Sequence, residues 1–147
     1  MTGMRSALQD TLAEFGVREI TEPQRLGGGS SQENWAFDAE MATDAGTVWR
    51  PLLMRRVPQG GVVDTDRDVE FELLRALSVT DLPVAHVYVS DDGSRLTRPA
   101  MIVDRLPGRA HRGVLRESDP LELGTAGRLT LARTLPVLLA GVHSVDV

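Results

Sequence analysis

The glycine-rich run at residues 27–31 is the first segment of the chain whose composition suits a chemical task. It includes Gly28, Gly29, Ser30 and Ser31, and a loop without bulky side chains can bring its backbone N–H groups onto phosphate oxygens. The same glycines also fit an ordinary tight hairpin that requires positive φ. The run therefore predicts a phosphate-binding loop, with a plain hairpin turn as its alternative.

An arginine and a glutamate further along the chain could form an ion pair. Arg55 falls in a predicted strand, and Glu70 falls on the apolar stripe of the helix predicted after it. A buried carboxylate needs water or a cation, and the planar fork of arginine suits it well. Such a cation could also hold the phosphates of a nucleotide. Two alternatives stay open: Glu70 could reach solvent at the flank of the helix, and Arg56 could face inward instead of Arg55.

Other kinds of catalytic and metal chemistry have less support in the sequence. The 3 histidines lack the spacing of metal ligands, and the absence of cysteine excludes thiolate sites. The acidic run at residues 64–68 lacks the glycine and the closing glutamate of a calcium loop. Ser30 and Ser31 have no evident histidine partner, so a nucleophilic serine is not favoured. We predict no catalytic residue and no metal ligand.

The elements that must position these residues begin with a short helix and three strands. Residues 6–15 have helical periodicity, and Gly16 is expected to end that helix. Strands are predicted over residues 17–26, around Trp35 and Phe37, and over residues 47–57. Turns at the glycine-rich run and at residues 43–46 connect them, and Pro51 indicates an edge or a bulge.

The second half of the predicted fold adds one helix and two strands. The helix follows the acidic run, ends near Leu77, and has an inward stripe that includes Leu73 and Leu74. Strands at residues 84–90 and 99–106 complete a five-stranded antiparallel sheet with one inserted helix, an α+β fold. A final helical pattern begins near residue 121, and Pro136 should kink it.

Length and charge limit the class of protein. A chain of 147 residues suits one domain of ordinary size. The formal net charge of -5, without a basic cluster, argues against a nucleic-acid partner. No apolar run approaches the roughly 20 residues of a membrane span, and the N-terminus has no export signal. We therefore expect a cytoplasmic protein without a membrane or nucleic-acid partner.

The order of these motifs resembles the aminoglycoside phosphotransferase and choline kinase superfamily, over nearly the whole chain. Residues 28–35 look like the nucleotide loop of that family, and residues 53–58 look like its third strand. Residues 69–77 are similar to its ion-pair helix, and residues 99–108 to its last N-lobe strand and hinge. The resemblance implies a protein-kinase-like N-lobe at residues 1–108. Residues 109–147 would then be a linker and the first helix of a C-lobe.

The resemblance also implies a cofactor and roles for individual residues. ATP would bind, with Mg²⁺ in a complete enzyme, and the acceptor would be a hydroxylated small molecule. Arg55 would contact the phosphates and pair with Glu70. The hinge backbone at Asp104, Arg105 and Leu106 would hydrogen-bond adenine. All 16 basic residues of the chain are arginine, so arginine stands where the family has lysine.

The chain departs from the family in the parts that perform phosphoryl transfer. The family's His-Gly-Asp catalytic loop is absent from the sequence, and so is its later metal-binding aspartate. Phosphoryl transfer needs an acceptor-orienting base and carboxylates that hold Mg²⁺. We therefore expect an N-terminal part of such an enzyme, inactive as this chain. The alternative is a non-catalytic binding module that self-associates through the surface that would otherwise face a C-lobe.

Overall fold

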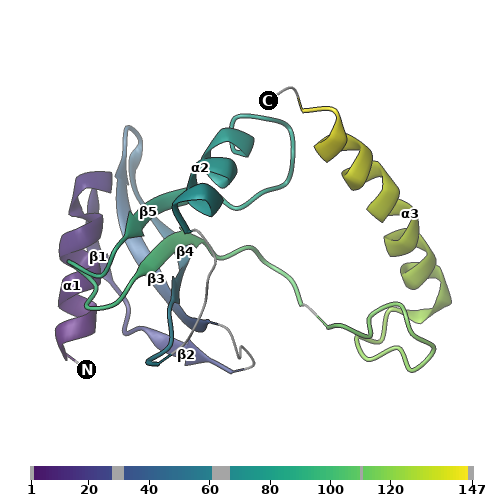
Figure 1. The fold of residues 1–147 in the computed structure, drawn as a ribbon, viewed down its shortest axis with the longest axis horizontal. Coiled ribbons are helices and arrows are strands. Elements are labelled where there is room, and N and C mark those ends of the chain that lie inside the picture. The colour runs from purple at the N-terminus through teal and green to yellow at the C-terminus, as the bar shows by residue number, and fades with distance from the viewer. Residues whose placement is uncertain (1, 28–31, 61–66, 110, 146–147) are drawn as a thin grey trace. The chain divides into compact units, whose positions relative to one another are not determined.

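The computed structural model describes residues 2–27, 32–60, 67–109 and 111–145. These residues form an α+β structure with three α-helices and a six-stranded antiparallel sheet (Figure 1). The chain divides into two compact units, of which the first contains residues 1–79 and 84–106 and the second contains residues 80–83 and 107–147. The whole sheet lies in the first unit. The division at residue 108 into lobe and linker stays a prediction.

The strands before the second helix form a meander, whereas the last two strands are reversed in order across the sheet. Its strands are β1 (Val17–Ile20), β2 (Gln24–Leu26), β3 (Glu33–Thr43), β4 (Gly46–Arg56), β5 (Val87–Asp91) and β6 (Ala100–Asp104). The order across the sheet is β1-β3-β4-β6-β5, and β2 also pairs with β3. The longest pairing joins β3 to β4 from Glu33↔Arg56 to Thr43↔Gly46, which confirms the predicted turn at residues 43–46.

The prediction of five strands was wrong, because residues 17–26 form two strands rather than one. The break contains Pro23, which has no N–H to donate to the ladder. At the break, Thr21 replaces regular pairing with two bonds to Asp38 on β3. The Thr21 N–H donates to the Asp38 carbonyl over 2.9 Å, and the Asp38 N–H donates to the Thr21 hydroxyl over 2.8 Å. The side chain thus satisfies a backbone group that the ladder leaves unpaired.

Pro51 was predicted to mark an edge or a bulge, but its strand β4 is an inner strand with β3 and β6 on its two sides. In β4 only the residues from Leu52 onward pair with β6, so Pro51 lies where that pairing ends. Its carbonyl accepts the N–H of Arg105, the residue that follows β6. Proline is tolerated here because its missing N–H interrupts no bond to β6.

Two helices cover opposite faces of the sheet (Figure 1). Helix α1 (Thr2–Leu12) continues into a 3-10 turn (Ala13–Phe15) and ends, as predicted, at Gly16, whose φ of 75° is in the left-handed region. Helix α2 (Arg67–Leu77) lies on the other face. The predicted stripe of α2 was partly wrong, since Leu73 is 51% exposed, whereas Phe71 and Leu74 pack on the sheet.

The strand residues alternate between the two faces. On the α1 face, Leu8 and Leu12 of the helix pack with a larger cluster from the sheet that includes Phe37, Leu52 and Met54. On the α2 face the cluster is smaller, and consists of Val87, Met101 and Val103 with Leu53, Ala85, Phe71 and Leu74 around it. The α1 face therefore supplies most of the apolar burial.

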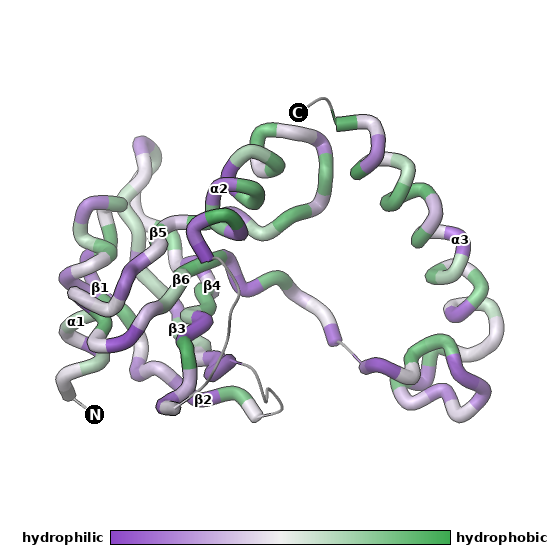
Figure 2. Tube along the Cα trace, in the orientation of Figure 1, coloured by the Kyte–Doolittle hydropathy of each residue, from purple (hydrophilic) through white to green (hydrophobic). Residues whose placement is uncertain are grey.

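The second unit contains helix α3 (Gly124–His143) and the loops before it. The Asp119 carboxylate accepts the N–H groups of Leu123 and Gly124, so it satisfies donors at the start of the helix. No residue of α3 is buried, and hydrophobic residues occur along its length (Figure 2). The kink predicted at Pro136 stays a prediction. None of the helices in the described ranges has the length and apolar character needed to cross a membrane.

Candidate functional site

Adjacent arginines at the end of β4 point to opposite faces of the sheet. Arg56 is paired in register with Glu33, and its side chain binds that residue on the α1 face. Arg55 is paired in register with Asn34, and its side chain extends toward α2. Neighbouring side chains of a strand always diverge in this way. The open question of which arginine meets Glu70 is thereby settled in favour of Arg55.

The predicted ion pair between strand and helix is confirmed. Nη1 of Arg55 lies 2.5 Å from Oε1 of Glu70, with 29% and 26% of the two side chains exposed. Nε of Arg55 also donates to Oε1 of Gln32 over 2.9 Å. Glu70 therefore does not extend freely to solvent. A positive group is held on the α2 face, near the end of the segment that joins β2 to β3.

Of the predicted phosphate loop, Gly28, Gly29, Ser30 and Ser31 lie outside the described residues. The strands that flank them, β2 and β3, are antiparallel neighbours. Gln32 is the first described residue after the loop, and it bonds Arg55. The role of the glycines stays a prediction.

The predicted hinge follows β6, and two of its backbone donors are already used. The N–H of Asp104 donates to the His86 carbonyl over 2.8 Å, and the N–H of Arg105 donates to the Pro51 carbonyl over 2.9 Å. Within the described ranges, the N–H of Leu106 has no such bond, and its side chain is 56% exposed. Of the three residues of the predicted hinge, Leu106 is thus the one whose N–H has no backbone partner among the described residues.

The side chains of the hinge are held by neighbouring strands. The hydroxyl of Tyr88 donates to Oδ1 of Asp104 over 2.9 Å. Burial and the Asp104 carboxylate raise the pKa of Tyr88 to about 12, so the phenol stays protonated and remains a donor. Nη2 of Arg105 lies 2.7 Å from Oδ1 of Asp38 on β3. These contacts fix the hinge against the sheet.

A second ionic cluster, which sequence reasoning missed, lies on the α1 face around Glu33. Oε2 of Glu33 accepts from Nη2 of Arg56 over 2.9 Å and from Nη2 of Arg98 over 2.8 Å. The Arg56 guanidinium also lies 5.4 Å from the centre of the Trp35 ring. Burial alone would raise the pKa of Glu33, but hydrogen bonds from Arg56, Arg98 and Trp35 lower it from 4.5 to about 2. This cluster ties β3, β4 and the segment before β6 together.

The signal that could have revealed this cluster is the pairing of β3 with β4. Once the hairpin turn at residues 43–46 is placed, register alone puts Glu33 opposite Arg56. Arg98 has no comparable signal, because it lies 65 residues along the chain from Glu33.

The histidines do not form a metal site in the described part of the chain. No group of three or more His, Asp or Glu residues there could hold a metal ion. The His86 ring packs edge-on against Tyr88, and Nδ1 of His111 accepts the N–H of Gly113. Both contacts fit structural roles.

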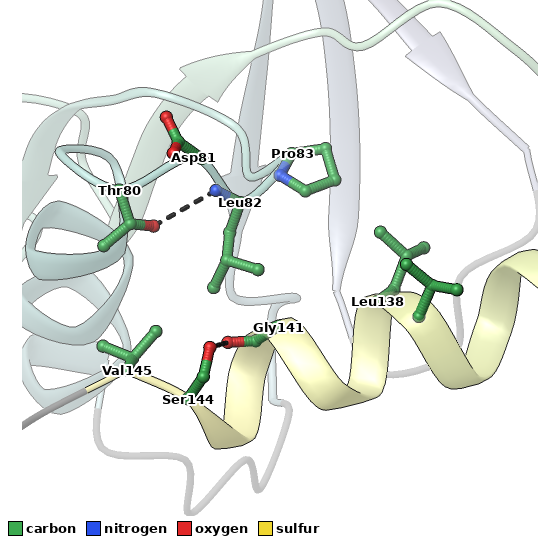
Figure 3. A pocket seen from close by; sticks show the side chains of 9 residues that line it. Thr80, Asp81, Leu82, Pro83, Leu138, Gly141, Ser144 and Val145 are labelled. Carbon is green, nitrogen blue, oxygen red and sulfur yellow. Dashed lines mark hydrogen bonds between the residues drawn. The ribbon is translucent and has the colours of Figure 1, made fainter.

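A cavity of about 550 Å³ lies in the second unit, beside the C-terminal half of α3 (Figure 3). The Thr80 hydroxyl at its edge accepts the N–H of Leu82, and the Ser144 hydroxyl donates to the Gly141 carbonyl. Asp81 is the one charged group among its lining residues. Because its hydroxyls are engaged locally and no charges converge, the cavity offers little that would orient a ligand.

Comparison with known proteins found no match, either to a family model or to a curated protein sequence. The functional proposal therefore depends on the geometry of the α2 face and on the resemblance of the motifs.

Proposed function

We propose that the chain is the nucleotide-binding part of an ATP-dependent small-molecule phosphotransferase. Its sheet and α2 would form a kinase-like N-lobe, similar to that of the aminoglycoside phosphotransferase and choline kinase superfamily. ATP would lie under the loop at residues 27–31. In a complete enzyme, with Mg²⁺ bound, the γ-phosphate would pass to a hydroxyl group of the acceptor. This chain, which has no His-Gly-Asp sequence, would bind ATP without turning it over.

The observation that carries the proposal is the ion pair between Arg55 and Glu70. An ion pair between a central strand and the helix that follows it holds a cation at a set distance from the sheet. Kinase-like sites use a basic residue in this position for the nucleotide phosphates. The pair is only partly buried, so the guanidinium can be reached by a ligand.

The hinge supports the same proposal. Adenine recognition by a backbone needs an N–H donor and a carbonyl acceptor on one edge. The N–H groups of Asp104 and Arg105 are used within the protein, which leaves the N–H of Leu106 as the donor for adenine. Asp104 and Arg105 would then position the hinge, and their carbonyls would supply the acceptor.

The test is a calorimetric titration of the purified chain with ATP and Mg²⁺. The wild-type chain should bind ATP, and Arg55→Ala should bind it at least about tenfold more weakly, since a charge-assisted hydrogen bond is lost. Circular dichroism should show the same fold for both. Arg75→Ala is the matched control, because Arg75 also pairs with a glutamate of α2 but is exposed.

Either of two results would contradict the proposal. If the wild-type chain does not bind ATP, the proposal of a nucleotide site is refuted. If wild type and Arg55→Ala bind ATP with equal affinity, the chain binds a nucleotide but Arg55 does not contribute to that binding.

A second candidate function is a non-catalytic module that associates with itself. Its supporting observation is α3, which has no buried residue and carries exposed hydrophobic side chains at Leu129, Leu135, Val137, Leu138, Leu139 and Val142. Apolar surface of this kind is typical of interaction sites. The test is light scattering of the purified wild-type protein and of Leu139→Asp. A wild-type mass of two chains, reduced to one chain in Leu139→Asp, would favour the module. A wild-type mass of one chain would count against it.

A further inference from the structure

The guanidinium of Arg55 has three nitrogens, and the protein binds two of them. Nε donates to Gln32 and Nη1 donates to Glu70. Within the described residues, Nη2 has no hydrogen bond and no ion pair. Nη2 therefore keeps both of its N–H donors for a ligand on the α2 face, on a cation that is partly buried.

The two anchored nitrogens determine the direction of the third. A guanidinium is planar, so bonds at Nε and Nη1 fix both its position and the plane in which Nη2 lies. Glu70 alone would leave the group free to rotate about that single contact. Gln32 removes this freedom. An ammonium group also has three N–H donors, but they rotate about one nitrogen, so two protein partners would not hold the third donor in a fixed plane as they do for a guanidinium.

We infer that Gln32 is a positioning residue, which holds the Arg55 guanidinium so that Nη2 is the donor to a phosphate oxygen of the nucleotide. The inference depends on the proposed function, because it takes ATP as the ligand of the α2 face. It goes further in naming the donor atom and the residue that orients it. The glutamine suits this task because its neutral carbonyl accepts from Nε without neutralising the cation.

The binding test uses Gln32→Met, which keeps the length of the side chain and removes the acceptor. ATP affinity, measured by calorimetry on the full chain with Mg²⁺, should fall roughly fivefold to tenfold, as expected for a misdirected charge-assisted bond. The control is Gln9→Met on α1, which also loses one side-chain hydrogen bond but lies on the opposite face. Its affinity should equal that of wild type.

A spectroscopic test detects the hydrogen bond between Arg55 and Gln32 in the absence of nucleotide. In ¹⁵N-labelled protein, the Nε–H signal of Arg55, identified by its disappearance in Arg55→Lys, should exchange slowly with water. In Gln32→Met it should exchange rapidly. In Gln32→Glu it should again exchange slowly. Affinity for ATP should nevertheless stay low in Gln32→Glu, because a carboxylate spans Nε and Nη2 together and occupies the phosphate donor.

The outcomes separate the inference from the proposed function. If wild type binds no ATP, the proposed function fails and the phosphate role of Nη2 fails with it. If wild type binds ATP and Gln32→Met binds it equally well, the inference is overturned while the nucleotide site stands. Wild-type affinity in Gln32→Glu, or rapid exchange of Nε–H in wild type, would also overturn it.

Discussion

Replacement of Glu33 by glutamine tests how strongly the ionic cluster on the α1 face stabilises the fold. The Glu33 side chain is 12% exposed, and Arg56 and Arg98 both donate to the same carboxylate oxygen. A carboxamide offers one acceptor oxygen, and its NH₂ group would face arginine donors. Glu33→Gln therefore leaves at least one buried arginine without a counter-charge.

The lowered pKa of Glu33 gives the size of the effect. A shift from 4.5 to about 2 corresponds to about 3 kcal/mol of free energy of unfolding. Because the folded-state pKa is the lower one, this contribution is complete above about pH 4.5 and is lost as the pH falls toward about 2. The difference between wild type and Glu33→Gln should thus be about 3 kcal/mol at neutral pH and shrink below about pH 4.5.

Urea denaturation followed by tryptophan fluorescence measures this difference, since Trp35 contacts both Glu33 and Arg56. Urea is preferable to guanidinium chloride because added salt screens ion pairs. Glu72→Gln is the control, as the Glu72–Arg75 pair is exposed and such pairs contribute below about 1 kcal/mol. A loss under about 1 kcal/mol in Glu33→Gln at neutral pH, or a loss that stays constant down to about pH 3, would refute the reasoning.

Two further substitutions test local features of the first unit. Gly16→Ala should lower the free energy of unfolding by about 1 kcal/mol, because Gly16 has a positive φ. Its control is Gly3→Ala within α1, which should leave the free energy of unfolding unchanged or raise it slightly. Thermal melts measure both effects. Asp91 is buried, and although burial raises its pKa, N–H groups of Leu96, Arg95 and Gly93 lower it overall. Asp91→Asn should therefore destabilise the fold at neutral pH by about 1–3 kcal/mol. In urea titrations, the difference in free energy of unfolding between wild type and Asp91→Asn should become smaller as the pH falls below the usual pKa of an aspartate. An unchanged unfolding midpoint in Gly16→Ala, or a pH-independent effect in Asp91→Asn, would contradict these two expectations.

The sequence correctly predicted the ends of elements that are determined by the backbone conformation of a few neighbouring residues. Gly16 ends α1 because only glycine adopts the left-handed conformation at little cost. The turn at residues 43–46 has the composition of a tight hairpin. In both places the deciding interaction lies within a few residues along the chain, so the sequence is sufficient.

The failures arose where a contact distant in sequence decided the outcome. Pro23 is a local signal for the break between β1 and β2, but the bond that satisfies the Asp38 N–H there comes from the hydroxyl of Thr21, which is distant from Asp38 in sequence. The rotation of α2, which exposes Leu73 and packs Phe71, depends on the shape of the sheet beneath it. Helical periodicity identifies a stripe of apolar residues, but packing decides whether a residue at the margin of that stripe is buried or exposed.

The choice between Arg55 and Arg56 shows how the core determines the site. A slip of one residue in β4 would exchange the two arginines and place Arg56 toward Glu70. The same slip would move Leu52 and Met54, both fully buried, from the α1 core to the other face. Each of these side chains would lose burial worth up to about 1.5–3 kcal/mol. The slip would also separate Arg56 from Glu33, its partner in the register of β3 and β4. The identity of the cation beside Glu70 is therefore a consequence of apolar packing on the opposite face of the sheet.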